Sequence, residues 1–109
     1  EDFDYLESLE INDNSSRKLT SNYYDILRGI LDVIALNRGY KIYSHKAFTY
    51  FLKEIQESIL SDKFDRLRQI RNGINYYGKP ISTSEASEYV KEMREMIHTL
   101  IGKYLKGLE

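Results

Sequence analysis

Residues 17–38 read RKLTSNYYDILRGILDVIALNR, and this stretch decides the fold class of the chain. Its apolar residues recur at steps of three and four, which is the period of one face of an α-helix. The stretch therefore predicts a long helix from about Arg17 to Arg38, and Gly39 is placed to end it in the left-handed conformation. The predicted apolar face comprises Leu19, Tyr23, Ile26, Leu27, Ile30, Val33 and Ile34.

The sequence on both sides of this stretch repeats the helical period. A short helix is predicted over residues 2–10, followed by a polar turn over residues 12–16. After the long helix, Ser44 is a suitable N-cap for a helix whose apolar face runs from Phe48 to Ile59. Ser61 and Asp62 predict a break there, because serine caps and aspartate favours a first turn.

Two further helices complete the pattern. One has an apolar face that ends at Tyr77, which predicts that Tyr77 is a core residue, and Gly78-Lys79-Pro80 stops this helix. Ser82 and Glu85 have the spacing of a capping box at the start of the last helix. The sequence therefore predicts an all-α fold, an antiparallel bundle of four to five helices.

The 109 residues fit one domain. We expect an N-terminal helix and turn over residues 1–14, a core bundle over 15–105, and a tail over 106–109 whose last two residues derive from a tag. The net charge of −1 gives no global field toward nucleic acid. No cysteine is present, and no apolar run is long enough to span a membrane. We expect a cytoplasmic protein with no membrane contact, no metal site and no cofactor.

The most distinctive polar pattern is a stripe of Arg68, Arg71, Asn72 and Asn75. These positions share one face of a helix. Guanidinium and carboxamide groups together form a donor-rich surface that suits phosphate oxygens. Lys79 extends the basic stretch, and the set of five is our predicted nucleic-acid-binding surface. In the alternative interpretation Arg68 pairs with Asp65 and the two asparagines are solvated surface.

Single residues near this stripe suggest further expectations. Gly73 is unfavourable inside a helix, which predicts that something approaches its backbone closely. Tyr76 lies off the apolar face, so we expect its phenol to be free. His98 is expected to be exposed. His45 follows the Ser44 cap and is expected to pack or cap, and it meets Arg71 only if the fold brings its loop there.

Two runs, GYKIYSH at residues 39–45 and RLRQIRNGINYYG at residues 66–78, resemble archaeal members of the HEPN superfamily. The similarity extends over about residues 15–105. It implies a HEPN-like helical bundle that forms a homodimer, with the motif helices meeting in a cleft at the dimer axis. Many members of the superfamily are metal-independent ribonucleases. Others pair with a small nucleotidyltransferase in toxin–antitoxin modules.

The signature of that family is an arginine, a polar residue, and a histidine that should fall at position 76, 77 or 78. Arg71 and Asn72 match the first half, whereas Tyr76, Tyr77 and Gly78 occupy the second. Histidine suits proton transfer because its pKa is near neutral. A phenol with a pKa of about 10 is a poor base at pH 7. The resemblance therefore implies that phosphate binding is kept and catalysis is weak or absent.

Three functions follow as hypotheses. The first is a dimeric HEPN-type domain that binds RNA, a nucleotide or a nucleotidyltransferase partner with little or no catalysis. The second is a toxin-like, metal-independent endoribonuclease that uses Arg71, Asn72, Asn75 and Tyr76 as catalytic residues. The third is a pure protein-interaction module of a toxin–antitoxin system.

Overall fold

The computed structural model of this chain describes residues 15–106, and its helices follow the predicted order. The elements are α2 (Ser16–Asn37), α3 (His45–Glu54), α4 (Ser58–Tyr77), α5 (Thr83–Leu100) and a π-helical turn, η1 (Ile101–Leu105). The described part of the chain contains no strand, so the all-α prediction is confirmed for it. The predicted helix over residues 2–10 and the last three residues of the predicted tail lie outside the described residues.

Most predicted helix ends are confirmed. Gly39 follows α2 with a φ of +84°, and Gly78 ends α4 with a φ of +62°, a region that glycine enters without steric cost. The Ser44 hydroxyl accepts a hydrogen bond from a first-turn amide of α3 at 3.2 Å. Ser82 and Glu85 form the predicted capping box, with both hydrogen bonds at 3.0 Å. Side-chain caps and glycines therefore set these boundaries locally.

The predicted break at Ser61-Asp62 is wrong. The chain turns earlier, at Gln56, whose φ is +68°, and α4 begins at Ser58. Ser61 lies inside α4, fully buried, and its hydroxyl donates to the carbonyl of Thr49 on α3 at 2.8 Å. Ile59, which was expected on the apolar face, is 72% exposed. The Ser61 hydroxyl links α4 to α3, a tertiary contact that the capping preference of serine does not predict.

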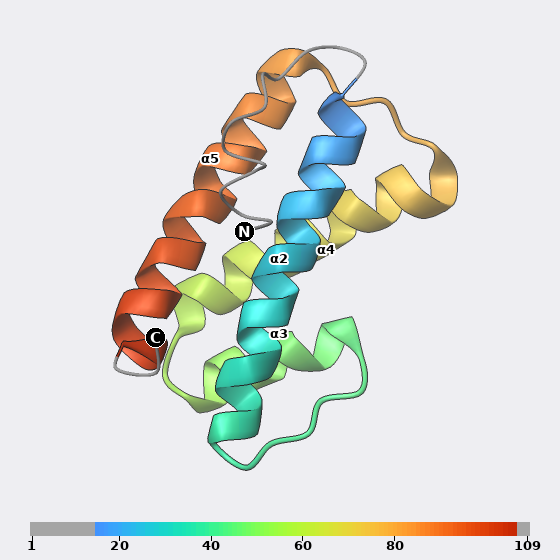
Figure 1. Cartoon of the computed structure of the whole chain (residues 1–109). Coiled ribbons are helices and arrows are strands. Elements are labelled where there is room, and N and C mark those ends of the chain that lie inside the picture. Colours follow the sequence, from blue (N-terminus) through green and yellow to red (C-terminus); the bar gives the residue numbers. More distant parts are fainter. Residues whose placement is uncertain (1–14, 107–109) are drawn as a thin grey trace.

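The helices differ in relative direction (Figure 1). Pairs between α2 and α4 run in opposite order along the two helices, from Arg17 with Gly78 to Asp25 with Arg71, so these helices are antiparallel. By contrast, α2 and α5 lie side by side and run in the same direction, contrary to a fully antiparallel bundle. The Arg38 guanidinium at the end of α2 lies 5.3 Å from the ring centre of Tyr104, just after α5.

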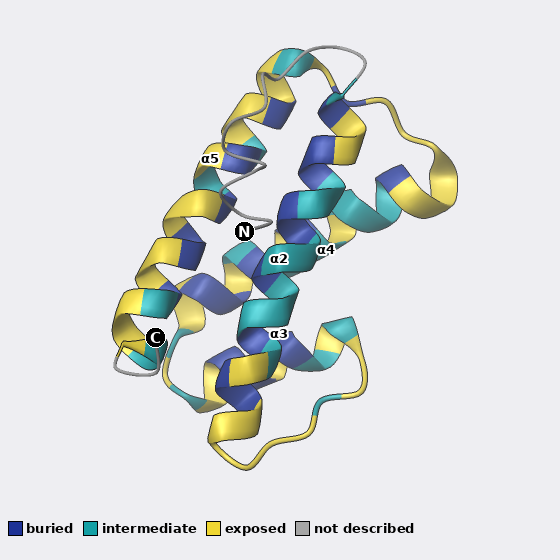
Figure 2. Ribbon diagram, in the orientation of Figure 1, coloured by how far each residue is buried: buried dark blue, intermediate teal, exposed yellow. Residues whose placement is uncertain are grey.

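The core lies where these helices face one another (Figure 2). Its largest fully buried side chains are Tyr23, Tyr24, Leu27, Leu31, Ile34, Leu52, Phe64, Leu67, Met93, Ile97 and Leu100. Full burial of one such side chain contributes about 1.5–3 kcal/mol. A smaller cluster of Ile74, Ile81 and Ala86 joins the end of α4 to the start of α5. The core thus fixes α4 against α2 along the polar stripe.

Candidate functional site

Arg71 is the residue of the predicted stripe that forms an ion pair with α2. Its side chain is 17% exposed, and its Nη2 donates to Oδ1 of Asp25 on α2 at 3.1 Å. Its guanidinium carbon lies 5.4 Å from the ring centre of Tyr24, also on α2. A guanidinium over an aromatic face is attracted by the ring quadrupole. These two contacts aim Arg71 at the α2–α4 interface.

Arg68 makes the ion pair that the alternative interpretation anticipated. Its Nε and Nη2 both donate to Oδ1 of Asp65, at 3.2 and 2.9 Å. The Asp65 carboxylate also accepts from Thr49 at 3.3 Å and from Gln69 at 3.0 Å. The hydrogen bond from Arg68 is the largest influence on Asp65 and holds the pKa of that carboxyl below its usual value. The charge of Arg68 is therefore partly balanced within the fold.

The other members of the stripe lie farther along α4. Asn75 is exposed and accepts a hydrogen bond through Oδ1 from the Ser21 hydroxyl on α2 at 3.3 Å. Asn72 is half-buried. Tyr76 is 70% exposed, as expected, but Tyr77 is 84% exposed, so its predicted place in the core is wrong. The last turn of α4 extends beyond the core, which leaves both phenols in water.

Lys79 is not brought to Arg71. Its side chain crosses Gly73, where a Cβ atom would meet the Lys79 Cδ at 3.5 Å. The Lys79 amide also donates to the Gly73 carbonyl at 3.0 Å. Both residues line a groove of about 290 Å³ between α4 and α5. The approach expected at Gly73 is therefore made by the chain's own lysine, on the side of α4 that faces α5 instead of α2.

Four residues complete the surroundings of Arg71, and the sequence prediction did not assign them to the site: Tyr24, Asp25 and Arg28 from α2, and His45 from α3. The Tyr24 hydroxyl lies 3.0 Å from His45 Nδ1, and the two ring centres are 5.6 Å apart. The fold does bring His45 toward Arg71, and Tyr24 contacts both side chains. We call Arg28, Arg68 and Arg71 the guanidinium cluster.

The arginines of the cluster influence the pKa values of both Tyr24 and His45. Burial raises the pKa of Tyr24 to about 12, although Arg71, Arg68 and Arg28 each oppose that rise. Burial also lowers the pKa of His45, and the positive charges of Arg28 and Arg71 lower it further. Near pH 7 the phenol therefore keeps its proton and the imidazole is neutral.

Two donors of the cluster have no acceptor. The Nε atoms of Arg28 and Arg71 are buried, and neither finds a hydrogen-bond partner among residues 15–106. An unsatisfied buried donor on a charged group costs at least about 1–3 kcal/mol. Because these two atoms have no exposed surface, an incoming oxyanion would have to bind the other N–H groups of the two guanidiniums.

Other site chemistries find less support in residues 15–106. No three His, Asp or Glu side chains of that range gather into a group able to hold a metal ion. Within residues 15–106, no helix combines the length and the apolar composition that a membrane span requires. His98 is exposed on α5, as expected.

A pattern in the sequence could have located the second half of the site. Arg17, Ser21, Asp25 and Arg28 recur at helical steps along α2. Three of them pair in reverse order with Gly78, Asn75 and Arg71 of α4. The polar stripe on α4 thus faces a matching polar stripe on α2. The sequence prediction did not identify the stripe on α2 because the apolar periodicity of that helix is more pronounced.

No known protein family, no curated protein sequence and no solved structure matches the chain.

Proposed function

We propose that this chain binds the phosphate backbone of RNA through the guanidinium cluster and has little or no catalytic activity. The observation that carries this proposal is the convergence of three guanidiniums, those of Arg28, Arg68 and Arg71, on the surroundings of Tyr24. Arginine presents its N–H groups in a rigid fork that matches phosphate oxygens.

The charge balance of the cluster also favours an anion. Asp25 pairs with Arg71 and Asp65 pairs with Arg68, whereas Arg28 forms no ion pair with any residue from 15 to 106. Three guanidiniums and two carboxylates leave one positive charge over. This excess is small, so the site supports modest, salt-sensitive binding by itself.

The state of His45 favours binding over catalysis. Because Tyr24 retains its proton, its hydroxyl can donate to Nδ1 of His45, and with that direction of the bond the imidazole proton is on Nε2. In that tautomer Nε2 is a hydrogen-bond donor and lacks the free electron pair that a general base needs. His45 then adds one more donor beside the arginines.

The HEPN resemblance extends this proposal to a homodimer in which two copies of α4 meet and two guanidinium clusters share one strand. A second copy would double the excess charge. Sedimentation or light scattering tests the dimer separately from RNA binding. Pairing with a small nucleotidyltransferase stays a prediction.

The direct test is fluorescence anisotropy with single-stranded RNA over a range of salt concentrations. We expect Arg71→Gln and Arg28→Gln each to weaken binding about tenfold and to reduce the salt slope by about one. Arg66→Gln is the matched control, because Arg66 lies on the same helix but pairs with Glu92 on α5. Equal affinity of wild type, Arg71→Gln and Arg28→Gln would contradict the proposal.

A metal-independent ribonuclease is the second candidate. The contact between Tyr24 and His45 favours a catalytic site at His45 over one at Tyr76. In such a reaction, His45 takes the proton of a ribose 2′-hydroxyl and the 2′-oxygen bonds to phosphorus. The bond from phosphorus to the 5′-oxygen breaks, and that oxygen receives the proton from the imidazolium. This route requires the other tautomer, with the proton on Nδ1.

The ribonuclease candidate is tested by RNA cleavage in EDTA. If it is correct, His45→Gln abolishes cleavage, whereas Tyr76→Phe leaves it intact. Cleavage that is absent in the wild type, or unchanged in His45→Gln, removes this candidate without affecting the binding proposal.

A further inference from the structure

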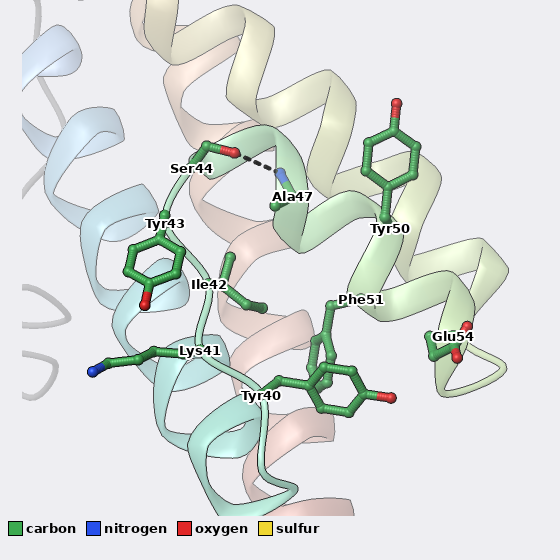
Figure 3. A pocket seen from close by; sticks show the side chains of 9 residues that line it. All are labelled: Tyr40, Lys41, Ile42, Tyr43, Ser44, Ala47, Tyr50, Phe51 and Glu54. Atoms are coloured by element: carbon green, nitrogen blue, oxygen red, sulfur yellow. Dashed lines mark hydrogen bonds between the residues drawn. The ribbon is translucent and has the colours of Figure 1, made fainter.

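A tyrosine-lined groove lies between α3 and the connector that joins α2 to α3 (Figure 3). It has a volume of about 400 Å³. Tyr40, Ile42 and Tyr43 line it from the connector, and Tyr50, Phe51 and Glu54 line it from α3. We call it the tyrosine groove. A volume of this size is sufficient for one or two planar ring systems.

The aromatic rings of the groove remain open to solvent. Tyr43 is 85% exposed, Tyr50 is 60% exposed and Tyr40 is 41% exposed. Figure 3 shows Tyr40 lying against Phe51, and the two ring centres are 5.2 Å apart. Phe51 is buried, so the Tyr40 ring packs against the core on that side. Exposed aromatic rings that gather on one surface indicate a binding surface more often than chance.

The connector and α3 contain more basic than acidic residues, and Lys41 is the basic side chain that lines the groove. From residue 38 to residue 53 the sequence contains four basic residues, Arg38, Lys41, Lys46 and Lys53, and no acidic residue. The chain as a whole has a net charge of −1. Glu54, just beyond this segment, is the one acidic side chain that lines the groove. Basic residues interleaved with exposed aromatic rings are typical of surfaces that bind single-stranded nucleic acid.

A protein partner fits this surface less well. The centres of protein–protein interfaces are depleted of lysine, whereas Lys41 lines this groove. A polyanion whose flat bases stack on tyrosine accounts for the rings and the charge together.

The groove and the surroundings of the guanidinium cluster include consecutive residues of the chain. Ser44 lines the groove and caps α3 through its bond to Ala47, which Figure 3 shows as a dashed line. The next residue, His45, bonds to Tyr24 beside Arg71. Because Ser44 and His45 are consecutive residues, we infer that a single strand can contact both surfaces.

We propose that the tyrosine groove binds the bases of single-stranded RNA by stacking, while the guanidinium cluster binds its phosphates. This inference rests on the proposed function and specifies the form of the RNA. The ligand is single-stranded, because paired bases in a duplex do not expose their faces. Tyr43 and Tyr50 provide the most accessible rings.

The test uses two probes, a short fluorescein-labelled single-stranded RNA and inorganic polyphosphate, which has the charge but no bases and is measured as a competitor. We expect Tyr43→Ala and Tyr50→Ala each to weaken RNA binding about tenfold, the effect of losing one stacked base. Polyphosphate binding and the salt slope should not change. Tyr43→Phe and Tyr50→Phe should bind like the wild type, because stacking uses the ring and not the hydroxyl.

Tyr77→Ala is the matched control, because Tyr77 is as exposed as Tyr43 but lies at the far end of α4. These positions are in water, so their substitution should not affect folding, which circular dichroism checks. A duplex RNA of equal length should bind more weakly than the single strand.

The outcomes separate the two proposals. If Tyr43→Ala and Tyr50→Ala bind RNA like the wild type while Arg71→Gln loses both probes, the groove inference is overturned and the phosphate site stands. Equal affinity for duplex and single strand also overturns the groove inference alone. If the wild type binds neither probe, the proposed function fails and the groove inference fails with it.

Discussion

The hydroxyl oxygen of Tyr24 lies 3.0 Å from Nδ1 of His45, which joins the middle of α2 to the first residue of α3. The same tyrosine supports the Arg71 guanidinium on its ring face. Tyr24 is 1% exposed, so its position is fixed by the core. A core residue therefore positions both an imidazole and a guanidinium at the candidate site.

Substitution of Tyr24 by Phe should loosen this arrangement without emptying the core. We expect a loss of about 0.5–1.5 kcal/mol in the free energy of unfolding, the net contribution of one hydrogen bond, measured by urea denaturation. The pKa of His45 should rise, because the bond from Tyr24 stabilises the neutral imidazole. NMR titration measures this shift. Tyr76→Phe is the control and should change neither quantity. An unchanged His45 pKa in Tyr24→Phe would show that this bond does not determine the imidazole's state.

The lowered pKa of His45 predicts a pH dependence of stability. The imidazole is harder to protonate in the folded chain than in the unfolded chain, where its pKa is near 6.5. Its contribution is therefore complete above pH 6.5 and is lost as the pH falls toward the lower folded value. Thermal or urea unfolding between pH 8 and pH 5 measures this slope, and His45→Gln should reduce it. The charged and titratable groups around His45 are Tyr24, Asp25 and Arg28 of α2 and Arg68 and Arg71 of α4.

An equal slope in wild type and His45→Gln would contradict this assignment.

RNA affinity should have the opposite pH dependence to that of stability. A bound phosphate raises the pKa of a neighbouring imidazole, so RNA affinity should increase as the pH falls through the His45 titration.

Asp25 competes with any anion for Arg71. Its carboxylate accepts from Nη2 of Arg71, and its side chain is 45% exposed. Asp25→Asn removes this negative charge, so RNA should bind about threefold or more tightly at low salt, and the gain should fade as salt is added. Anisotropy titrations measure the effect. Glu88→Gln on α5 removes an equal charge far from the cluster and is the control. A weaker complex with Asp25→Asn would mean that Asp25 orients Arg71 more than it neutralises it.

Gly73 provides a test of whether this face of α4 is already filled by the chain. It lies inside a helix, and a Cβ there would make ordinary contact with the flexible Lys79 side chain at 3.5 Å. Gly73→Ala should therefore stabilise the chain by up to about 1 kcal/mol in urea denaturation. Gly78→Ala is the opposite control, because a φ of +62° disfavours alanine. Destabilisation by Gly73→Ala would indicate that another surface, such as a second copy, packs on Gly73.

Helix positions and caps could be predicted from sequence because they depend on near neighbours in the chain. The Ser82–Glu85 capping box and the left-handed Gly39 and Gly78 are recognisable from spacing alone. The incorrect predictions concern residues whose positions depend on tertiary contacts. Ser61 has the propensity of a cap but is bonded to Thr49 inside the bundle. Tyr77 has the spacing of a core residue but extends past the last helix that could cover it.

The candidate site divides in the same way. The helical period of the sequence determined that Arg68, Arg71, Asn72 and Asn75 would share the polar side of one helix, because that period is a property of the backbone itself. Only the tertiary structure decided that Arg71 faces Asp25 and Tyr24, that Lys79 lies on the other side of α4, and that His45 joins the site from another helix. These relationships join residues more than twenty positions apart or opposite sides of one helix, and they follow from how the apolar faces pack, which no local pattern specifies.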